Sequence, residues 1–210
     1  MNIEDILEYN GLSISILYKL SYKSDLGVSL KRTLNHFDKD ALLNEAYDYA
    51  DWLDGIDLDS LVDLDFRVKS YDSINLKYDR YISEGKPVKK VFNDILGMRA
   101  FCDNYDDLSS CDRNDFVVVD MSQGKSNDDG YRGVHIYYEI DNFHYPIEIQ
   151  FNTMFDRQMN NWLHDYLYKK DYPIEYGKKL RAVYEKGNIH TLNDFERVLF
   201  NDILGSKEQE

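Results

Sequence analysis

A carboxylate inside an apolar strand is the first residue of this sequence that could do chemistry. In the segment Ile147-Glu148-Ile149-Gln150-Phe151, side chains alternate between two faces, so Glu148 shares a face with Gln150 and the apolar residues share the other. A glutamate in such a strand is costly to bury unless it is paired or binds a cation. The two readings are a glutamate paired with an arginine under a covering helix, and a glutamate that serves a site.

A basic cluster lies earlier in the chain. Arg67 and Lys69 alternate along a short predicted strand and therefore share a face. Ser73 and Lys77 are spaced i, i+4 on the helix expected to follow, so they also share a face. Cations and a hydroxyl where a strand enters a helix suit a polyphosphate, and ordinary solvated charges are the alternative.

The segment from Asp94 to Arg99 combines an acid at a strand entrance with a cation inside the strand. Gly97 leaves room for a ligand to approach the backbone. Asp94 is a candidate hard-oxygen ligand for magnesium. The alternative is that Asp94 is an ordinary turn residue or cap.

A glycine-flanked tyrosine follows, in the segment Gly130-Tyr131-Arg132-Gly133-Val134-His135. A tyrosine held between glycines can offer its ring face to a nucleic-acid base by stacking. Because the chain has 18 tyrosines, an ordinary loop tyrosine is the alternative.

Helical periodicity marks the two ends of the chain, and alternation marks its middle. Apolar residues recur at helical spacing through 1–62 and again from 155 onward, with helices expected near 174–185 and 192–204. Between them we expect five strands, the last two joined in an antiparallel hairpin, at Asp65–Lys69, Leu96–Cys102, Phe116–Asp120, Gly133–Ile140 and His144–Asn152. The sequence therefore predicts an α+β fold with a mixed, mainly antiparallel five-stranded sheet flanked by N- and C-terminal helices.

Length and composition favour one compact domain. A chain of 210 residues can hold one full core, and its three prolines form no linker-like stretch. We expect a single domain over 1–210, with a helical N-terminal extension (1–62), a catalytic core that contains the sheet (63–153) and C-terminal helices (154–210).

The net charge of −14, from 25 basic and 39 acidic residues, disfavours a large nucleic-acid partner. A small basic pocket can still bind a nucleotide, because local charges dominate within a Debye length of ~8–10 Å. The N-terminal residues lack a signal-peptide pattern, and no stretch approaches the ~20 apolar residues of a membrane span. A cytoplasmic protein without membrane contact is expected.

Together these clusters resemble the synthetase domain of the RelA/SpoT family, the guanosine pyrophosphokinases that make (p)ppGpp. The resemblance spans roughly Asp65 to Trp162 with chain order intact, and the length is similar to that of the small, single-domain members. Its motifs are Arg-x-Lys-x-x-x-Ser-x-x-x-Lys (67–77), Asp-x-x-Gly-x-Arg (94–99), Gly-Tyr-Arg-x-x-His (130–135) and Glu-x-Gln-x-x-Thr (148–153).

The resemblance implies a nucleotidyltransferase-like sheet and a donor site for ATP. Arg67 and Arg99 would hold ATP by sandwiching its adenine. The phosphates would be gripped by Lys69, Ser73 and Lys77. The implied cofactor is Mg²⁺, with Asp94 and Glu148 as its ligands.

The resemblance also implies an acceptor site for GDP or GTP. Tyr131 would stack on guanine, and Glu148 would help to deprotonate the ribose 3′-hydroxyl that attacks the β-phosphorus of ATP, releasing AMP. Nearer the phosphates and ribose of the acceptor would lie Lys125, Asn127 and His135, with Gln150 also on the acceptor side.

The sequence departs from the family pattern at two places. Asn152 stands where the family usually has arginine, and Arg157 on the next helix is a candidate substitute for that cation. Lys125 lies five residues before Gly130 and Asn127 three before it, which differs from the usual spacing of this loop.

Three functions therefore stay open. The first is (p)ppGpp synthesis, and the second is pyrophosphate transfer to the 3′ end of tRNA, as in toxin-like relatives. The third is a degenerate domain that binds nucleotides or a partner without catalysis. A homo-oligomer, in particular a tetramer formed through the terminal helices, is also an expectation of the resemblance.

Overall fold

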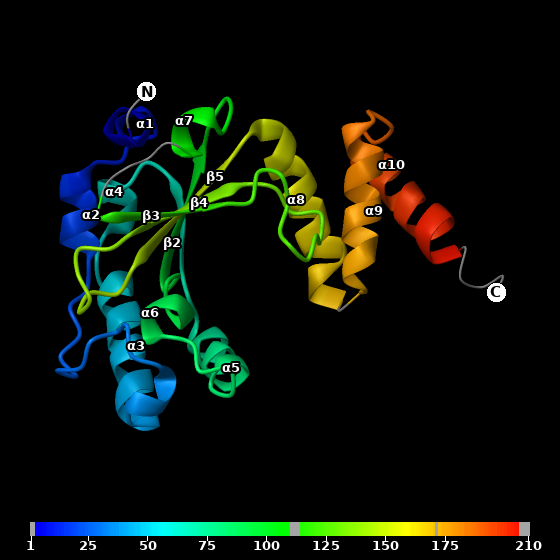
Figure 1. The fold of residues 1–210 in the computed structure, drawn as a ribbon. Coiled ribbons are helices and arrows are strands. Elements are labelled where there is room, and N and C mark those ends of the chain that lie inside the picture. The colour runs from blue at the N-terminus through cyan, green and yellow to red at the C-terminus, as the bar shows by residue number, and fades with distance from the viewer. Residues whose placement is uncertain (1–2, 110–113, 171, 206–210) are drawn as a thin grey trace. The chain divides into compact units, whose positions relative to one another are not determined.

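The computed structural model describes residues 3–109, 114–170 and 172–205 (Figure 1). Its contacts group into two compact units, which are described separately. The first unit comprises Met1–Phe101, Asp106–Val119 and His135–Phe151, and the second comprises Cys102–Tyr105, Asp120–Val134 and Asn152–Glu210. The expectation of a single domain stays a prediction.

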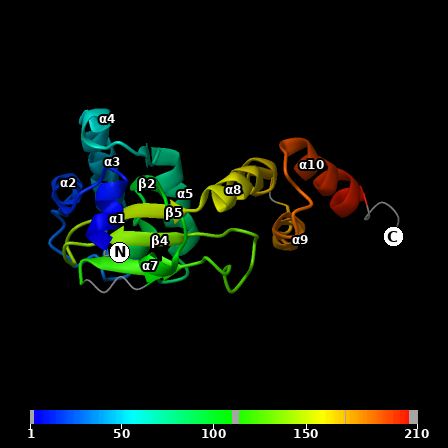
Figure 2. The same ribbon diagram turned by 90° about the horizontal axis from the view of Figure 1, so that it is seen from above.

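The described residues form a five-stranded sheet of mixed, mostly antiparallel strands, which confirms the predicted α+β class. The spatial order is β1-β2-β5-β4-β3, and Figure 2 shows β4 beside β5. All five predicted strands are present, with bounds β1 (Asp65–Val68), β2 (Leu96–Phe101), β3 (Phe116–Asp120), β4 (Val134–Tyr138) and β5 (Ile147–Asn152).

The pairing of β1 with β2 positions the basic residues of the first unit. The two strands are antiparallel, with Asp65 opposite Arg99 and Arg67 opposite Gly97. Because side chains alternate along a strand, these four residues lie on one face of the sheet.

Two helices of the first unit begin at polar side-chain caps. Asp38 accepts a hydrogen bond from the amide of Ala41 at the start of α3, and Ser70 accepts one from the amide of Ser73 at the start of α5. The N-terminal residues are helical, as predicted, in separate segments. The helical elements are α1 (Ile3–Tyr9), α2 (Ile14–Leu20), η1 (Leu34–His36), α3 (Lys39–Asp54), α4 (Leu58–Leu61), α5 (Tyr71–Tyr81) and α6 (Val88–Val91), and α7 (Asp106–Ser109) precedes β3.

The second unit is built on the C-terminal helices, which were also predicted. Thr153 caps the first of them by accepting from the amide of Asp156. The elements are α8 (Met154–Tyr166), η2 (Tyr168–Lys170), α9 (Ile174–Glu185), α10 (Leu192–Arg197) and the π-helical η3 (Val198–Leu204). Both ribbon views show α8, α9 and α10 as consecutive neighbours (Figures 1 and 2). Their apolar faces form one core, with Leu163, Leu180 and Phe195 at its centre.

Among the described residues, no helix is both long enough and apolar enough to cross a bilayer.

Candidate functional site

Two arginines flank a glycine on one face of the sheet. Arg67 lies on β1 opposite Gly97 of β2, and Arg99 is two residues farther along β2 on the same face. With neighbouring residues they line a recess of about 440 Å³, a size typical of ligand pockets. In the described part of the chain, neither guanidinium has an ion-pair or hydrogen-bond partner. Two such planar cations beside an open backbone can hold a flat aromatic ring.

Glu148 lies on the neighbouring strand, next to this recess. A Cβ built at Gly97 would stand 3.5 Å from Oε2 of Glu148, so the two residues are adjacent across β2 and β5. The glutamate is buried, with 7% of its surface exposed. The sequence prediction that Glu148 is a buried in-strand carboxylate that needs partners is therefore confirmed.

The partners of Glu148 come from β4 and from β5 itself. Its Oε1 accepts a hydrogen bond from Tyr137 Oη at 3.0 Å and lies 3.1 Å from Nδ1 of His135. Its Oε2 accepts from Nε2 of Gln150 at 2.7 Å. The structure thus brings together three predicted site residues, Glu148, His135 and Gln150, and adds Tyr137.

These contacts set the charge of Glu148. Burial by itself would raise the pKa of the carboxyl group. Hydrogen bonding and the charge of His135, followed by hydrogen bonds from Gln150 and Tyr137, outweigh burial and lower the pKa of Glu148 to about 2. Glu148 is therefore a fixed anion at neutral pH.

Asp94 is held by two of the predicted phosphate-binding lysines. Nζ of Lys69 lies 2.5 Å from its Oδ2, and Nζ of Lys77 lies 2.8 Å from its Oδ1. Burial lowers the pKa of Lys69 from its ordinary value, the charges of Lys77 and Arg67 lower it further, and Asp94 opposes the shift. Lys77 and Arg67 therefore both lie close enough to repel the charge of Lys69, and the Asp94 carboxylate lies between Lys69 and Lys77.

Ser73 lies in the first turn of the helix that carries Lys77. Its hydroxyl accepts a hydrogen bond from the hydroxyl of Ser70 at 3.0 Å, and its backbone amide donates to the same residue. The predicted i, i+4 relation of Ser73 and Lys77 on one helix is confirmed, because both belong to α5. The predicted strand ends one residue earlier than expected, at Val68, so Lys69 lies between β1 and α5.

The two acids have the chemistry of a magnesium site. Hard carboxylate oxygens suit Mg²⁺, which proteins usually bind through one or two carboxylates together with substrate phosphates. Within the described ranges, no group of three or more acidic, histidine or cysteine side chains is arranged to hold a metal by itself. Asp94 contacts Lys69 and Lys77, and Glu148 contacts His135, Tyr137 and Gln150. That the two carboxylates share one metal with substrate phosphates stays a prediction.

The predicted acceptor residues Lys125, Asn127 and Tyr131 belong to the second unit. Nζ of Lys125 lies 5.0 Å from the centroid of the Tyr131 ring and 2.6 Å from an oxygen of Asp129. The backbone amide of Tyr131 donates to Asp129 Oδ1 at 3.1 Å. Asn127 is exposed in the same loop. A cation over a half-buried ring makes this loop a candidate for binding an anionic aromatic ligand.

Asn152, where the sequence departs from the family pattern, is buried with 2% of its surface exposed. Its amide nitrogen donates to the backbone oxygen of Arg132 at 2.9 Å. Asn152 therefore contacts the loop that carries Tyr131 through a neutral hydrogen bond. Arg157, the suggested substitute cation, lies in the first turns of α8 and is 9% exposed. Whether it replaces the missing charge stays a prediction.

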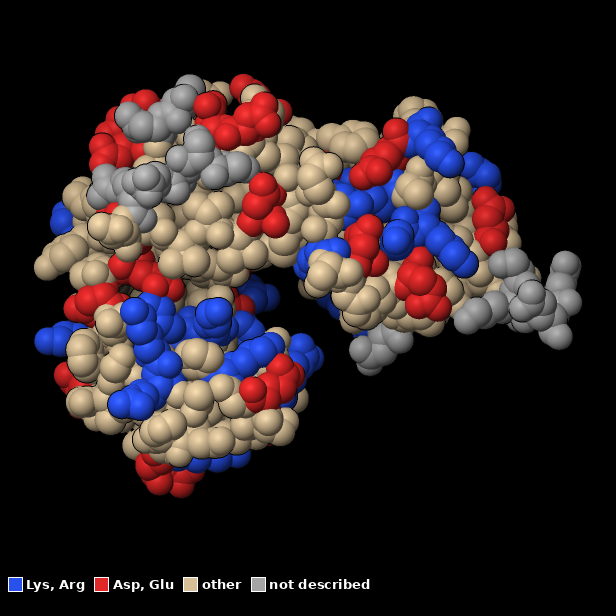
Figure 3. All heavy atoms as spheres, viewed as in Figure 1, with Lys and Arg blue, Asp and Glu red and all other residues tan. Residues whose placement is uncertain are grey.

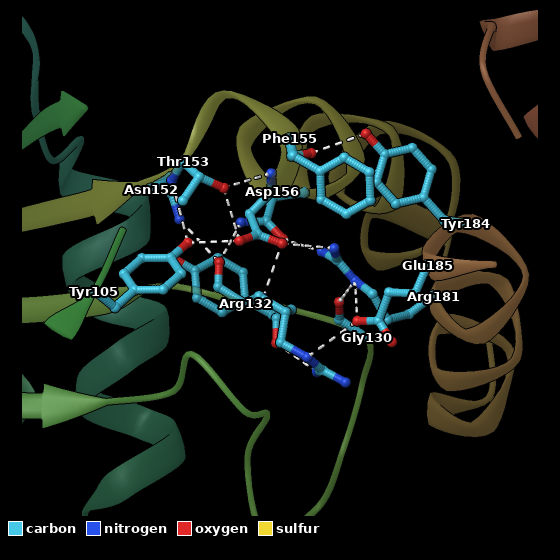
Figure 4. A network of polar contacts seen from close by, with 12 residues as sticks. Tyr105, Gly130, Arg132, Asn152, Thr153, Phe155, Asp156, Arg181, Tyr184 and Glu185 are labelled. Carbon is cyan, nitrogen blue, oxygen red and sulfur yellow. Dashed lines mark hydrogen bonds and ion pairs between the residues drawn. The ribbon is translucent and has the colours of Figure 1, made fainter. Parts of the chain in front are cut away.

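Sequence reasoning missed two sets of residues. The first is Tyr137, which contacts Glu148. Strand alternation could have identified it, because Tyr137 lies two residues after His135 and therefore on the same face. The other set is a buried polar network in the second unit, built around Arg181, Asp156 and Asn160 (Figure 4). Its only sequence signal is a cation at an apolar position of α9, four residues after Gly177.

Basic side chains gather on one face of the first unit despite the acidic composition. Figure 3 shows Lys and Arg over the region where Figure 1 draws α5 and α6. These helices carry Lys77, Arg80, Lys89 and Lys90. Lys89 is buried and paired with Glu139, so it adds little free charge there.

Comparison with known proteins gives one matching family model and several solved structures to which the chain is similar. Residues 66–172 match the family model described as the region found in RelA / SpoT proteins. Small alarmone synthetase 2 from Bacillus subtilis is 24% identical, with 80% of this chain and 98% of that chain covered and a TM-score of 0.43. Small alarmone synthetase 1 from the same organism, bound to its product pppGpp, is 23% identical over 80% and 94%, with a TM-score of 0.40. A GTP pyrophosphokinase family protein from Streptococcus pneumoniae is 22% identical over 80% and 95%, with a TM-score of 0.39. Among curated protein sequences, no significant match was found.

Proposed function

Because just over half of the chain matches the family model, it belongs to the RelA/SpoT family, and we propose that it is a (p)ppGpp synthetase. The reaction would transfer pyrophosphate from ATP to the ribose 3′-hydroxyl of GDP or GTP and release AMP. The observation that carries the proposal is the row of Arg67, Gly97, Glu148 and His135 across four neighbouring strands, all inside the matched region.

The donor site follows from the recess on β1 and β2. Arg67 and Arg99 would hold the adenine ring of ATP over Gly97, which has no side chain to block it. Lys69, Lys77 and Ser73 would bind the phosphates. Since both lysines are paired with Asp94, the polyphosphate would compete with this carboxylate for their ammonium groups.

Asp94 and Glu148 would hold Mg²⁺, which would supply positive charge to the reacting phosphates. The low pKa of Glu148 supports this role, because the side chain is already ionised and hydrogen-bonded in place. The same low pKa makes Glu148 a weak general base, since an efficient base has a pKa near the working pH. We therefore assign Glu148 to binding charge and orienting His135 rather than to proton removal.

The acceptor would bind through Tyr131, with its guanine stacked on the ring. The sequence prediction assigns the acceptor's phosphates and ribose to Lys125, Asn127, His135 and Gln150. Lys125 and Asn127 share the loop of Tyr131 in the second unit, whereas His135 and Gln150 contact Glu148 in the first unit. In the reaction the 3′-oxygen forms a bond to the β-phosphorus of ATP. The bond from that phosphorus to the α,β-bridging oxygen breaks, the hydroxyl proton passes to solvent water, and AMP leaves with the bridging oxygen on its α-phosphate. Such transfers depend chiefly on positioning and on neutralising charge.

A tRNA acceptor is the second candidate function. The basic face over α5 and α6 favours it, because phosphate contacts need such a surface (Figure 3). The net charge of −14 opposes it. A catalytically degenerate domain is the third candidate, suggested by Asn152 and opposed by the presence of both Asp94 and Glu148. A cytoplasmic location and a homo-oligomer stay predictions.

One experiment separates these functions. The protein is incubated with Mg²⁺ and labelled ATP, and with GDP, GTP or deacylated tRNA in parallel, and AMP and labelled product are measured. The Glu148→Gln variant serves as the inactive control, with its fold checked by circular dichroism. Label on the guanosine nucleotide is expected. Label that appears only on tRNA would show that tRNA is the acceptor and would rule out the alarmone function. The absence of AMP with every acceptor would favour the catalytically degenerate domain.

A further inference from the structure

Arg181 on α9 is a fully buried arginine, and each of its three guanidinium nitrogens contacts an acceptor. Only 1% of its surface is exposed. Its Nη1 contacts Asp156 Oδ1 at 2.7 Å, its Nη2 donates to Asn160 Oδ1 at 2.9 Å, and its Nε donates to the backbone oxygen of Gly130 at 2.7 Å. Figure 4 shows the guanidinium pointing between Asp156 and Gly130.

These contacts hold both peptide groups of Tyr131. The oxygen of Gly130 belongs to the peptide group before Tyr131, and Arg181 binds it directly. The amide of Arg132 belongs to the peptide group after Tyr131, and it donates to Asn160 Oδ1 at 3.2 Å, the same atom that accepts from Arg181. Arg181 therefore binds the peptide group before Tyr131 directly, and it also contacts the Asn160 side chain that binds the peptide group after Tyr131.

The following backbone oxygen of the loop is fixed as well. Nδ2 of Asn160 donates to the oxygen of Arg132 at 2.7 Å, and Asn152 donates to the same oxygen at 2.9 Å. Asn152 thus takes part in holding the loop, at the position where the family usually has a cation.

Close packing presses the loop against α9. A Cβ at Gly130 would come within 2.4 Å of the backbone oxygen of Gly177, and a Cβ at Gly177 would come within 1.9 Å of the backbone oxygen of Asp129. Gly130 also has a φ of +89°, which other residues rarely adopt. The loop therefore has little freedom to move away from Arg181.

The carboxylate that neutralises Arg181 is itself held in place. Asp156 Oδ2 accepts from Tyr105 Oη at 2.7 Å and from Thr153 Oγ1 at 2.9 Å. A buried ion pair of this kind adds little net stability compared with apolar packing, so its value lies in fixing one geometry. The geometry that it fixes is that of the segment that carries Tyr131.

We propose that Arg181 is a positioning residue for the acceptor nucleotide, because it binds the peptide group before Tyr131 and holds the Asn160 side chain that binds the peptide group after it. It thereby sets the position of the ring on which guanine stacks. This inference rests on the proposed function, since it assumes that Tyr131 binds guanine. It extends the site to α9, which lies beyond the matched residues 66–172.

The test compares Arg181→Lys with wild type and with Lys179→Met, a charged and exposed position on the same helix. Lysine keeps the charge beside Asp156 but cannot reach three acceptors with a planar fork. We measure KM for GDP, KM for ATP, kcat and the thermal midpoint. Loss of this fork is expected to raise KM for GDP about tenfold, the equivalent of one or two hydrogen bonds, and to leave KM for ATP unchanged. Lys179→Met is expected to behave as wild type.

A double variant tests the route through Tyr131. In a Tyr131→Ala background, Arg181→Lys is expected to have no further effect on KM for GDP, because both act on one contact. Additive effects would overturn the inference, as would equal rises in KM for GDP and KM for ATP. If Arg181→Lys does not fold, Asn160→Ala replaces it, and an unchanged KM for GDP in that variant would overturn the inference.

Calorimetric titration with GDP separates this inference from the proposed function. If wild type binds neither GDP nor, in a parallel titration, GTP, the proposed function fails and the inference falls with it. If wild type binds GDP and Arg181→Lys binds it equally well, the inference alone is wrong. If wild type binds GDP and Arg181→Lys binds it more weakly, the result supports both the proposed function and the positioning role of Arg181.

Discussion

Gly97 on β2 lies directly beside Glu148 on β5, with 3.5 Å between the position of a Cβ at residue 97 and Glu148 Oε2. The missing side chain keeps the surface between Arg67 and Arg99 open next to an ionised carboxylate. If a donor nucleotide binds there, Arg67 and Arg99 would contact its nucleobase and Glu148 would lie near its reacting phosphates. The first prediction follows from this neighbourhood.

Replacing Gly97 by valine is expected to block the donor site without harming the fold. Valine has a high strand propensity, so the thermal midpoint should stay constant or rise. Its branched side chain would fill part of the recess, and KM for ATP should rise about tenfold or more. Gly97→Ala, whose single Cβ makes an ordinary 3.5 Å contact, should show a smaller rise. An unchanged KM for ATP in both variants would show that ATP binds elsewhere.

Asp94→Asn is expected to separate nucleotide binding from turnover. Without the carboxylate, Lys69 and Lys77 lose their ion-pair partner and become available to phosphates. ATP binding measured by calorimetry without Mg²⁺ should therefore be equal to wild type or tighter. The kcat with Mg²⁺ should fall by about 100-fold or more, as for the loss of one charge-stabilising group.

The matched control for this variant is Asp79→Asn. Asp79 pairs with Lys39 at 3.2 Å on the surface, where both side chains are more than half exposed. Loss of this carboxylate should therefore change neither the affinity for ATP nor kcat. Weakened ATP binding by Asp94→Asn would contradict the view that Asp94 competes with phosphates for the lysines.

The lowered pKa of Glu148 predicts a pH-dependent contribution to stability. Its pKa is about 2 in the folded protein and about 4.5 ordinarily, so the native state favours the ionised form. The contribution is fully present above about pH 4.5 and is lost as the pH falls through about 2. It is at most on the order of 3 kcal/mol. The difference in unfolding free energy between wild type and Glu148→Gln should therefore shrink as the pH falls below about 4.5. A constant difference over this range would mean that Glu148 is not held by these partners.

Arg157 is proposed to supply the cation that Asn152 lacks. Arg157→Ala is then expected to lower turnover far more than Lys169→Ala, whose side chain is exposed and paired with Asp165 at 2.8 Å. Because Arg157 is buried, the thermal midpoint is measured for both variants, and turnover is compared at a temperature where both remain folded. Equal losses of turnover in the two variants would contradict the proposal that Arg157 supplies the missing cation.

Local sequence signals predicted the strands and helices well, because alternation and helical spacing act over a few residues. The alternation around Glu148 placed it on the polar face of β5, next to Gln150, as observed. The fold class therefore followed from the sequence.

Contacts between distant segments could not be predicted in this way. The register that places Arg67 opposite Gly97 depends on the pairing of two strands separated by α5 and α6. The pairing of Asp94 with both lysines, and the burial of Arg181 against Gly130, arise only when the chain is folded. The motifs named the residues of the candidate site but not what each one touches.

The position of the label in the product tests the central claim most directly. The protein is given GDP and either ATP labelled at the β- and γ-phosphates or ATP labelled at the α-phosphate. Pyrophosphate transfer predicts that the β,γ-label appears in ppGpp, attached at the 3′-hydroxyl, and that the α-label appears in AMP in equal amount. Label from the γ-phosphate alone with release of ADP, or no labelled guanosine product at all, would contradict it.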